Sequence, residues 1–184
     1  MTLNRKTFYL LGLVTLFGFS ALGALLITWF HDFTFLSMLS GGPHWTYQVF
    51  RGSIFGVISA LCLIWLVQFP ILRQPREFFT QLIRQAGLRM HDLLFLSLAA
   101  GIGEEILFRA AIQPFLGIWL TALIFVALHG YLNPFDLNMS LYGVLLIVVS
   151  AGMGYLFEHI GIYAAISAHF FIDCILFIRF NRGH

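Results

Sequence analysis

Charged residues are scarce in this sequence: Asp, Glu, Lys and Arg make up 10% of 184 residues, against about 25% in soluble domains. A water-soluble globule cannot cover its surface with so few charges when 60% of its residues are hydrophobic. With a mean hydropathy of +0.90, the chain is expected to have the lipid bilayer as its solvent. The formal net charge of +2 gives no support to a nucleic-acid partner.

Cysteine is also rare, and the first apolar run does not have the form expected of a signal peptide. Cys62 and Cys174 both lie inside apolar runs, so neither a disulfide framework nor a cysteine-rich metal site is predicted. The first apolar run, residues 8–30, is longer than a signal-peptide core of about 7–15 residues and has no small-residue cleavage site. We therefore expect it to be an uncleaved membrane span.

Long apolar runs predict an all-α fold, a polytopic membrane helical bundle of about six spans, since each span needs about 20 apolar residues. The predicted spans cover residues 8–30, 52–69, 93–114, 115–128, 140–157 and 162–180. Pro114 marks the predicted break between the third and fourth spans. Six spans would use roughly 120 of the 184 residues, so we expect short loops and no large domain outside the membrane within this sequence.

One hydrophilic stretch, residues 70–90, predicts a basic amphipathic helix. Pro75 favours its start and Gly87 its end. Arg and Gln alternate with four apolar residues at helical spacing, namely Phe78, Phe79, Leu82 and Ile83. We expect this helix to lie on the cytoplasmic leaflet; the alternative is a linker helix packed on the bundle.

The distribution of basic residues predicts the orientation, because cytoplasmic loops of membrane proteins carry an excess of Lys and Arg. Eight of the ten basic residues fall on cytoplasmic segments if the N-terminus is cytoplasmic: Arg5, Lys6, Arg73, Arg76, Arg84, Arg89, Arg179 and Arg182. An even number of spans then leaves both termini in the cytoplasm.

Small residues four apart predict where helices approach each other closely. Gly52 and Gly56 form such a pair in the second span, and Ala164 and Ala168 form another in the sixth. We expect these pairs to serve packing.

Ionisable residues inside the spans are concentrated in the second half of the chain: Glu104, Glu105, Arg109, His129, His169 and Asp173. Such groups are costly in a bilayer and usually face a bundle interior or a wet cavity. Glu105 and Arg109 are four apart on a helix and can form an ion pair. Glu104 is turned about 100° away, with Phe108 four residues later. A structural polar lock therefore explains Glu105 and Arg109 but leaves Glu104 without a local partner.

The histidines complete a candidate acid/base group. His129 ends the fourth span, while His169 and Asp173 are four apart on the sixth. Taken singly, His129 reads as an interfacial residue, and His169 and Asp173 can simply hydrogen-bond to each other. Helical rise nevertheless puts all three, with Glu104, at depths compatible with one cavity open to the cytoplasm.

Three segments resemble the motifs of the CPBP family (CAAX-protease and bacteriocin-processing), which are intramembrane glutamic endopeptidases. Residues 103–109, GEEILFR, are similar to E-E-x-x-x-R; residues 125–129, FVALH, to F-x-x-x-H; and residues 169–173, HFFID, to H-x-x-x-N or D. We therefore expect a CPBP-like catalytic core of four helices at 91–184. Residues 1–90 would hold two accessory spans and the linker helix.

The resemblance implies an endopeptidase that hydrolyses a peptide bond of a membrane-associated or hydrophobic-tailed peptide or protein within the bilayer. It implies that Glu104 and His129 activate the attacking water, and that His169 and Asp173 stabilise the oxyanion. Glu105 and Arg109 would support the site. No cofactor and no metal are implied, and bacterial relatives favour a bacterial inner membrane as the location.

Position 173 departs from the better-known CAAX-cleaving members, which carry asparagine there. An ionised aspartate accepts hydrogen bonds and cannot donate one. Asp173 is therefore either protonated and a donor, or it orients His169, which then binds the oxyanion alone.

Other interpretations stay open. In a zinc metalloprotease, Glu104, His129, His169 and Asp173 would be acceptable ligands, although the sequence has no H-E-x-x-H motif. In a non-catalytic membrane scaffold or immunity protein, the polar cluster would only hold helices together. Transport is a third option, because ionisable residues in spans also form proton relays, but nothing specific supports it.

Overall fold

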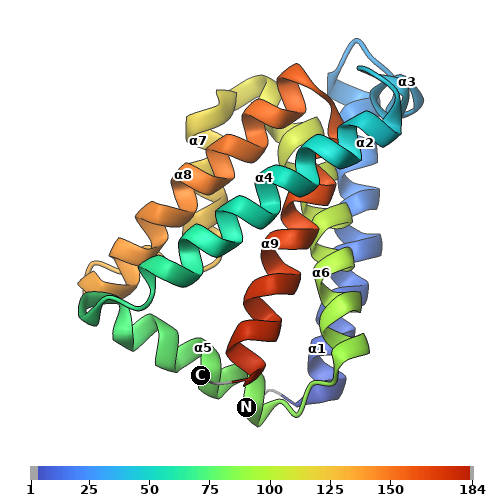
Figure 1. Ribbon diagram of the computed structural model, residues 1–184. Coiled ribbons are helices and arrows are strands. Elements are labelled where there is room, and N and C mark those ends of the chain that lie inside the picture. The colour runs from blue at the N-terminus through green and yellow to red at the C-terminus, as the bar shows by residue number, and fades with distance from the viewer. Residues whose placement is uncertain (1–3, 183–184) are drawn as a thin grey trace.

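The computed structural model describes residues 4–182, which form a bundle of helices (Figure 1). Their order is α1 (Arg5–Leu13), η1 (Val14–Phe19), α2 (Ser20–Phe30), α3 (Phe35–Ser40), α4 (Trp45–Leu66), η2 (Pro70–Leu72), α5 (Arg73–Gln85), α6 (Met90–Glu105), η3 (Ile106–Ile112), α7 (Gln113–Leu128), α8 (Leu137–His159) and α9 (Ile162–Arg182). Within this range, pairing of the β type is limited to an isolated bridge between Asn133 and Asp136. The predicted all-α fold class is confirmed.

Five helices of the described chain are long and apolar enough to cross a membrane: Arg5–Phe30, Trp45–Leu66, Met90–Leu128, Leu137–His159 and Ile162–Arg182. The third of these joins the predicted third and fourth spans. It has 39 residues, and a straight helix of that length would be ~58 Å long, about twice the ~30 Å thickness of the hydrocarbon core.

This long helix is bent rather than straight. Gly117 has φ 73° and ψ 170°, which is not a helical conformation. Figure 1 shows α7 lying behind α8 instead of continuing the line of α6. The break therefore lies at Gly117 and not, as predicted, at Pro114. Proline is tolerated in the first turn of a helix, and Pro114 occupies that position in α7.

The bundle has two ends, which we name the α5 end and the α3 end (Figure 1). At the α5 end, the Arg84 side chain donates hydrogen bonds to the carbonyls of Asn181 and Arg182, and Arg5 pairs with Asp92 at 2.8 Å. The start of α1 and the end of α9 therefore lie at the same end. This agrees with an even number of crossings; which side of the membrane this end faces stays a prediction.

The predicted close approach of small residues is confirmed between α4 and α9. A Cβ atom added at Gly52 would lie 2.1 Å from the Ala164 carbonyl oxygen, and one at Gly56 would lie 2.5 Å from that of Ala168. Only glycine allows the two backbones to pack at this distance.

The amphipathic helix predicted at 70–90 is α5, and its apolar face is turned towards the bundle. Ile83 is 4% exposed, and Phe79, Leu82 and Ile83 line an internal cavity. The helix therefore packs on the bundle, against α8 and α9, as the second alternative predicts; its position on the cytoplasmic leaflet stays a prediction.

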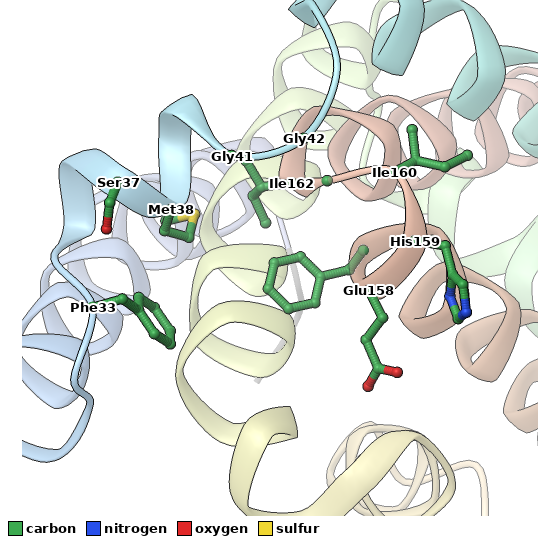
Figure 2. A pocket seen from close by; sticks show the side chains of 11 residues that line it. Phe33, Ser37, Met38, Gly41, Gly42, Glu158, His159, Ile160 and Ile162 are labelled. Carbon is green, nitrogen blue, oxygen red and sulfur yellow. The ribbon is translucent and has the colours of Figure 1, made fainter.

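A pocket of ≈260 Å³ lies at the α3 end (Figure 2). Phe33 and Met38 form one side of it, and the end of α8 with the exposed Glu158 and His159 forms the other. None of the six predicted site residues lines this pocket.

Candidate active site

A second cavity, of ≈390 Å³, lies inside the bundle, and its wall holds four predicted site residues. Glu104 comes from α6, His129 from the turn after α7, and His169 and Asp173 from α9. The rest of the wall is largely apolar and comes from α1, α5, α6, α8 and α9. Residues 69 positions apart in the chain thus face one cavity. The wall also includes side chains from α1 and α5, within the region predicted to be accessory.

Glu104 lies between the two histidines. It is 9% exposed, and its Oε2 is 3.6 Å from Nε2 of His129 and 3.8 Å from Nε2 of His169. Both distances exceed a direct hydrogen bond, which is at most ~3.2 Å. A water placed to one side of the Glu104–His129 pair can reach both groups at ~2.8 Å.

The His129 imidazole is oriented by its own helix. Its Nδ1 lies 2.7 Å from the Phe125 carbonyl oxygen. A carbonyl only accepts hydrogen bonds, so Nδ1 carries the proton and, in the neutral ring, Nε2 is free to accept. It is this Nε2 that faces Glu104.

The His169 imidazole is oriented from another helix. Its Nδ1 lies 2.8 Å from Oε1 of Glu105, and a carboxylate at this position fixes the proton on Nδ1. Its Nε2 faces Glu104 and lies 3.5 Å from Oδ2 of Asp173. Asp173 is therefore close to His169, as its spacing predicts, but Glu105 provides the short contact.

The predicted ion pair of Glu105 and Arg109 is confirmed. Nε of Arg109 lies 2.9 Å from Oε2 of Glu105, and both side chains are 0% exposed. Nη2 of Arg109 donates to the Ser150 hydroxyl on α8 at 2.8 Å. Glu105 therefore joins η3, α8 and α9 through one buried polar network, and it uses one oxygen for Arg109 and the other for His169.

The helix changes form directly after the two glutamates. Residues Ile106–Ile112 adopt a π-helix, which the sequence pattern did not indicate. Such turns are rare in proteins as a whole, but those that occur are often found at functional sites. Here the π-helix carries Arg109 towards α8, where Ser150 accepts its hydrogen bond.

Two tyrosines of the cavity wall were missed by the sequence analysis. Tyr131 stacks on the His129 ring, with 5.7 Å between centroids and an angle of 15°. Tyr142 meets Tyr131 edge to face at 5.8 Å. Burial, together with the carboxylates of Asp173 and Glu104, raises the pKa of the Tyr131 phenol, which stays protonated at neutral pH. Neither tyrosine belongs to one of the three motifs, so the spacing of residues in the sequence did not indicate that they line the site.

A structural zinc site needs about four protein ligands and a catalytic one about three. Among residues 4–182, no group of three or more His, Cys, Asp or Glu is arranged to hold a metal ion.

A comparison with known protein families finds a match in the part of the chain that holds this site. Residues 87–175 match the family described as type II CAAX prenyl endopeptidase Rce1-like. Over these residues, the chain is similar to the CPBP family. The matched range includes all six predicted site residues. The matched family is one of membrane proteases, and with five helices able to cross a membrane the chain is an integral membrane protein.

One relative is the uncharacterized protein YpbD of Bacillus subtilis (strain 168), which is 32% identical over 94 residues. The alignment covers 50% of this chain and 47% of the relative, so the chain spans about half the length of the curated relative that it matches. No solved structure matches the chain.

Proposed function

We propose that this chain is an intramembrane endopeptidase of the glutamic type. Its substrate would be a membrane-associated or hydrophobic-tailed peptide or protein, which it would cleave with a water activated by Glu104 and His129. One observation carries the proposal: Nε2 of His129 and Nε2 of His169 converge on the same carboxylate oxygen of Glu104, inside an apolar cavity.

The first step uses Glu104 as the general base. The attacking water donates one O–H to the Glu104 carboxylate and the other to the unprotonated Nε2 of His129, which directs an oxygen lone pair at the scissile carbonyl. As the C–O bond forms, one proton moves to Glu104. When the C–N bond breaks, Glu104 returns that proton to the leaving nitrogen, which gives an amine and a carboxylic acid.

The second requirement is a donor to the oxyanion. Nδ1 of His169 is engaged with Glu105, so the ring can donate from Nε2 only when both nitrogens carry protons. The Glu105 carboxylate, 2.8 Å from Nδ1, is the counter-ion of that imidazolium. Asp173 lies beside Nε2. It acts either as a protonated second donor or as an acceptor that aligns the Nε2–H group.

The apolar wall supports a substrate with a hydrophobic segment, because Phe, Leu and Ile side chains surround the polar site. The basic α5 end, which includes Arg73 and Arg84, supports a cytoplasmic location for this end of the bundle. A bacterial inner membrane is the proposed location, with the lipid bilayer as the route by which the apolar segment arrives.

The proposal is tested with purified protein in liposomes and fluorescence-quenched peptides that end in an apolar tail, each made with and without a prenyl group. We expect cleavage by the parent and by Glu77→Gln, an exposed control, and no cleavage by Glu104→Gln. The prenylated and plain peptides then define the substrate class. Failure of the folded parent to cleave either series would favour the non-catalytic scaffold.

A further inference from the structure

The turn after α7 fixes the direction in which Tyr131 points. Gly130 has φ +77°, a conformation that glycine adopts without strain. The Gly130 N–H donates to the Ala127 carbonyl at 2.9 Å and the Tyr131 N–H to that of Val126 at 3.4 Å. This is the Schellman pattern of a helix C-terminus, and it turns the chain back so that Tyr131 reaches His129.

The imidazole of His129 is restrained by a hydrogen bond and by two neighbouring rings, Tyr131 and Phe125, the latter tilted by 45° at 4.4 Å between centroids. The hydrogen bond from Nδ1 to the Phe125 carbonyl acts in the plane of the ring. The Tyr131 ring is nearly parallel to the imidazole, at 15°, and stacks on it with an offset, 5.7 Å between centroids. A hydrogen bond alone permits the ring to tilt about the N–H direction, whereas a stacked ring opposes that tilt.

Tyr131 is itself supported from α5. Phe79 contacts the Tyr131 ring edge to face at 5.7 Å, and Phe79 is in turn held by Tyr142 at 5.6 Å and Phe180 at 5.8 Å. An aromatic path therefore runs from α5 to His129. Its origin, Phe79, lies outside the range that matches the family.

We propose that Tyr131 is a positioning residue that holds the His129 imidazole towards Glu104, and that Phe79 braces Tyr131 from α5. The ring of Tyr131, rather than its hydroxyl, performs this function. In this arrangement, α5 both lines the cavity and, through Phe79, holds a residue that positions His129. The proposal rests on the proposed function for its effect on cleavage, but not for its effect on the His129 ring.

The first test needs no substrate. Diethyl pyrocarbonate modifies unprotonated imidazole nitrogens, and mass spectrometry of the folded protein in detergent gives the rate at His129. We expect several-fold faster modification in Tyr131→Leu and Phe79→Leu, and the parent rate in Tyr131→Phe. Phe69→Leu is the matched control, because Phe69 precedes η2, is 45% exposed and does not line the cavity.

The second test measures cleavage across pH. Tyr131→Leu should lower kcat by about 10- to 100-fold with little change in KM, since a misplaced catalytic group costs up to about 10²-fold. Tyr131→Phe should restore kcat and the pH profile. Thermal unfolding identifies any variant that fails to fold, and Phe79→Leu then carries the test.

Two results would overturn the proposal: an unchanged His129 rate in folded Tyr131→Leu, or a Tyr131→Phe protein as impaired as Tyr131→Leu. A parent that cleaves nothing, together with the expected modification rates, would reject the proposed function and leave the positioning of His129 standing.

Discussion

Replacing Glu105 by glutamine should destabilise the protein far more than replacing Glu104. Glu105 is 0% exposed and contacts two cationic or protonated groups, Arg109 at 2.9 Å and His169 at 2.8 Å. The substitution leaves the Arg109 guanidinium buried without its counter-ion. Breaking a buried pair in this way costs about 3–5 kcal/mol, which is a large share of the roughly 5–15 kcal/mol by which proteins are stable.

A double replacement separates the structural role of Glu105 from its positioning role. Glu105→Leu with Arg109→Met removes both charges and keeps the volume similar, and such exchanges of a buried pair are often neutral or stabilising. We expect the double variant to be more stable than Glu105→Gln but less stable than the parent, because Nδ1 of the buried His169 loses its partner. It should remain inactive, because nothing then holds Nδ1 of His169.

The assay is thermal unfolding of detergent-solubilised protein, followed by cleavage of the apolar peptide. Glu77→Gln serves as the control for charge loss, since Glu77 pairs with Arg73 at the same i, i+4 spacing but with 50% of its side chain exposed. Its unfolding temperature should not change measurably. Parent-like unfolding of Glu105→Gln would refute the stabilising role of the pair. Full activity of the double variant would refute the positioning of His169 by Glu105.

Three further predictions concern position 173, the metal and the topology. If Asp173 is a protonated donor, Asp173→Asn should keep its activity and lose less of it at high pH than the parent; an inactive Asp173→Asn enzyme at every pH would exclude that role. Cleavage should persist in EDTA, whereas a loss restored by added zinc would support the metalloprotease alternative. Reporter fusions after residues 40 and 160 should be periplasmic and a fusion after residue 85 cytoplasmic; a cytoplasmic signal at residue 40 would overturn the orientation.

Helical spacing correctly predicted the contacts that lie within one helix or in periodic stripes. The i, i+4 rule identified Glu105 and Arg109 as a pair, and the glycine stripe of α4 identified its contact with α9. The gathering of Glu104, His129, His169 and Asp173 around one cavity was also expected, and the structure brings them together.

Contacts between helices could not be predicted from spacing. The short bond from His169 to Glu105 joins residues 64 positions apart, and only the packing of α6 against α9 creates it. Periodicity likewise showed that Phe79, Leu82 and Ile83 share one face of α5, but not whether that face meets lipid or protein. The bend at Gly117 was not predicted because Pro114, three residues earlier, has the stronger tendency to break a helix.

The central claim is that Glu104 is the general base, and Glu104→Gln tests it most directly. Glutamine keeps the shape of the side chain and cannot accept the proton of the water. The measurement is the single-turnover rate of peptide cleavage by Glu104→Gln and by the parent, at matched folded fraction in liposomes. We predict that the variant folds like the parent and that cleavage is abolished; a folded variant with normal turnover would contradict the account.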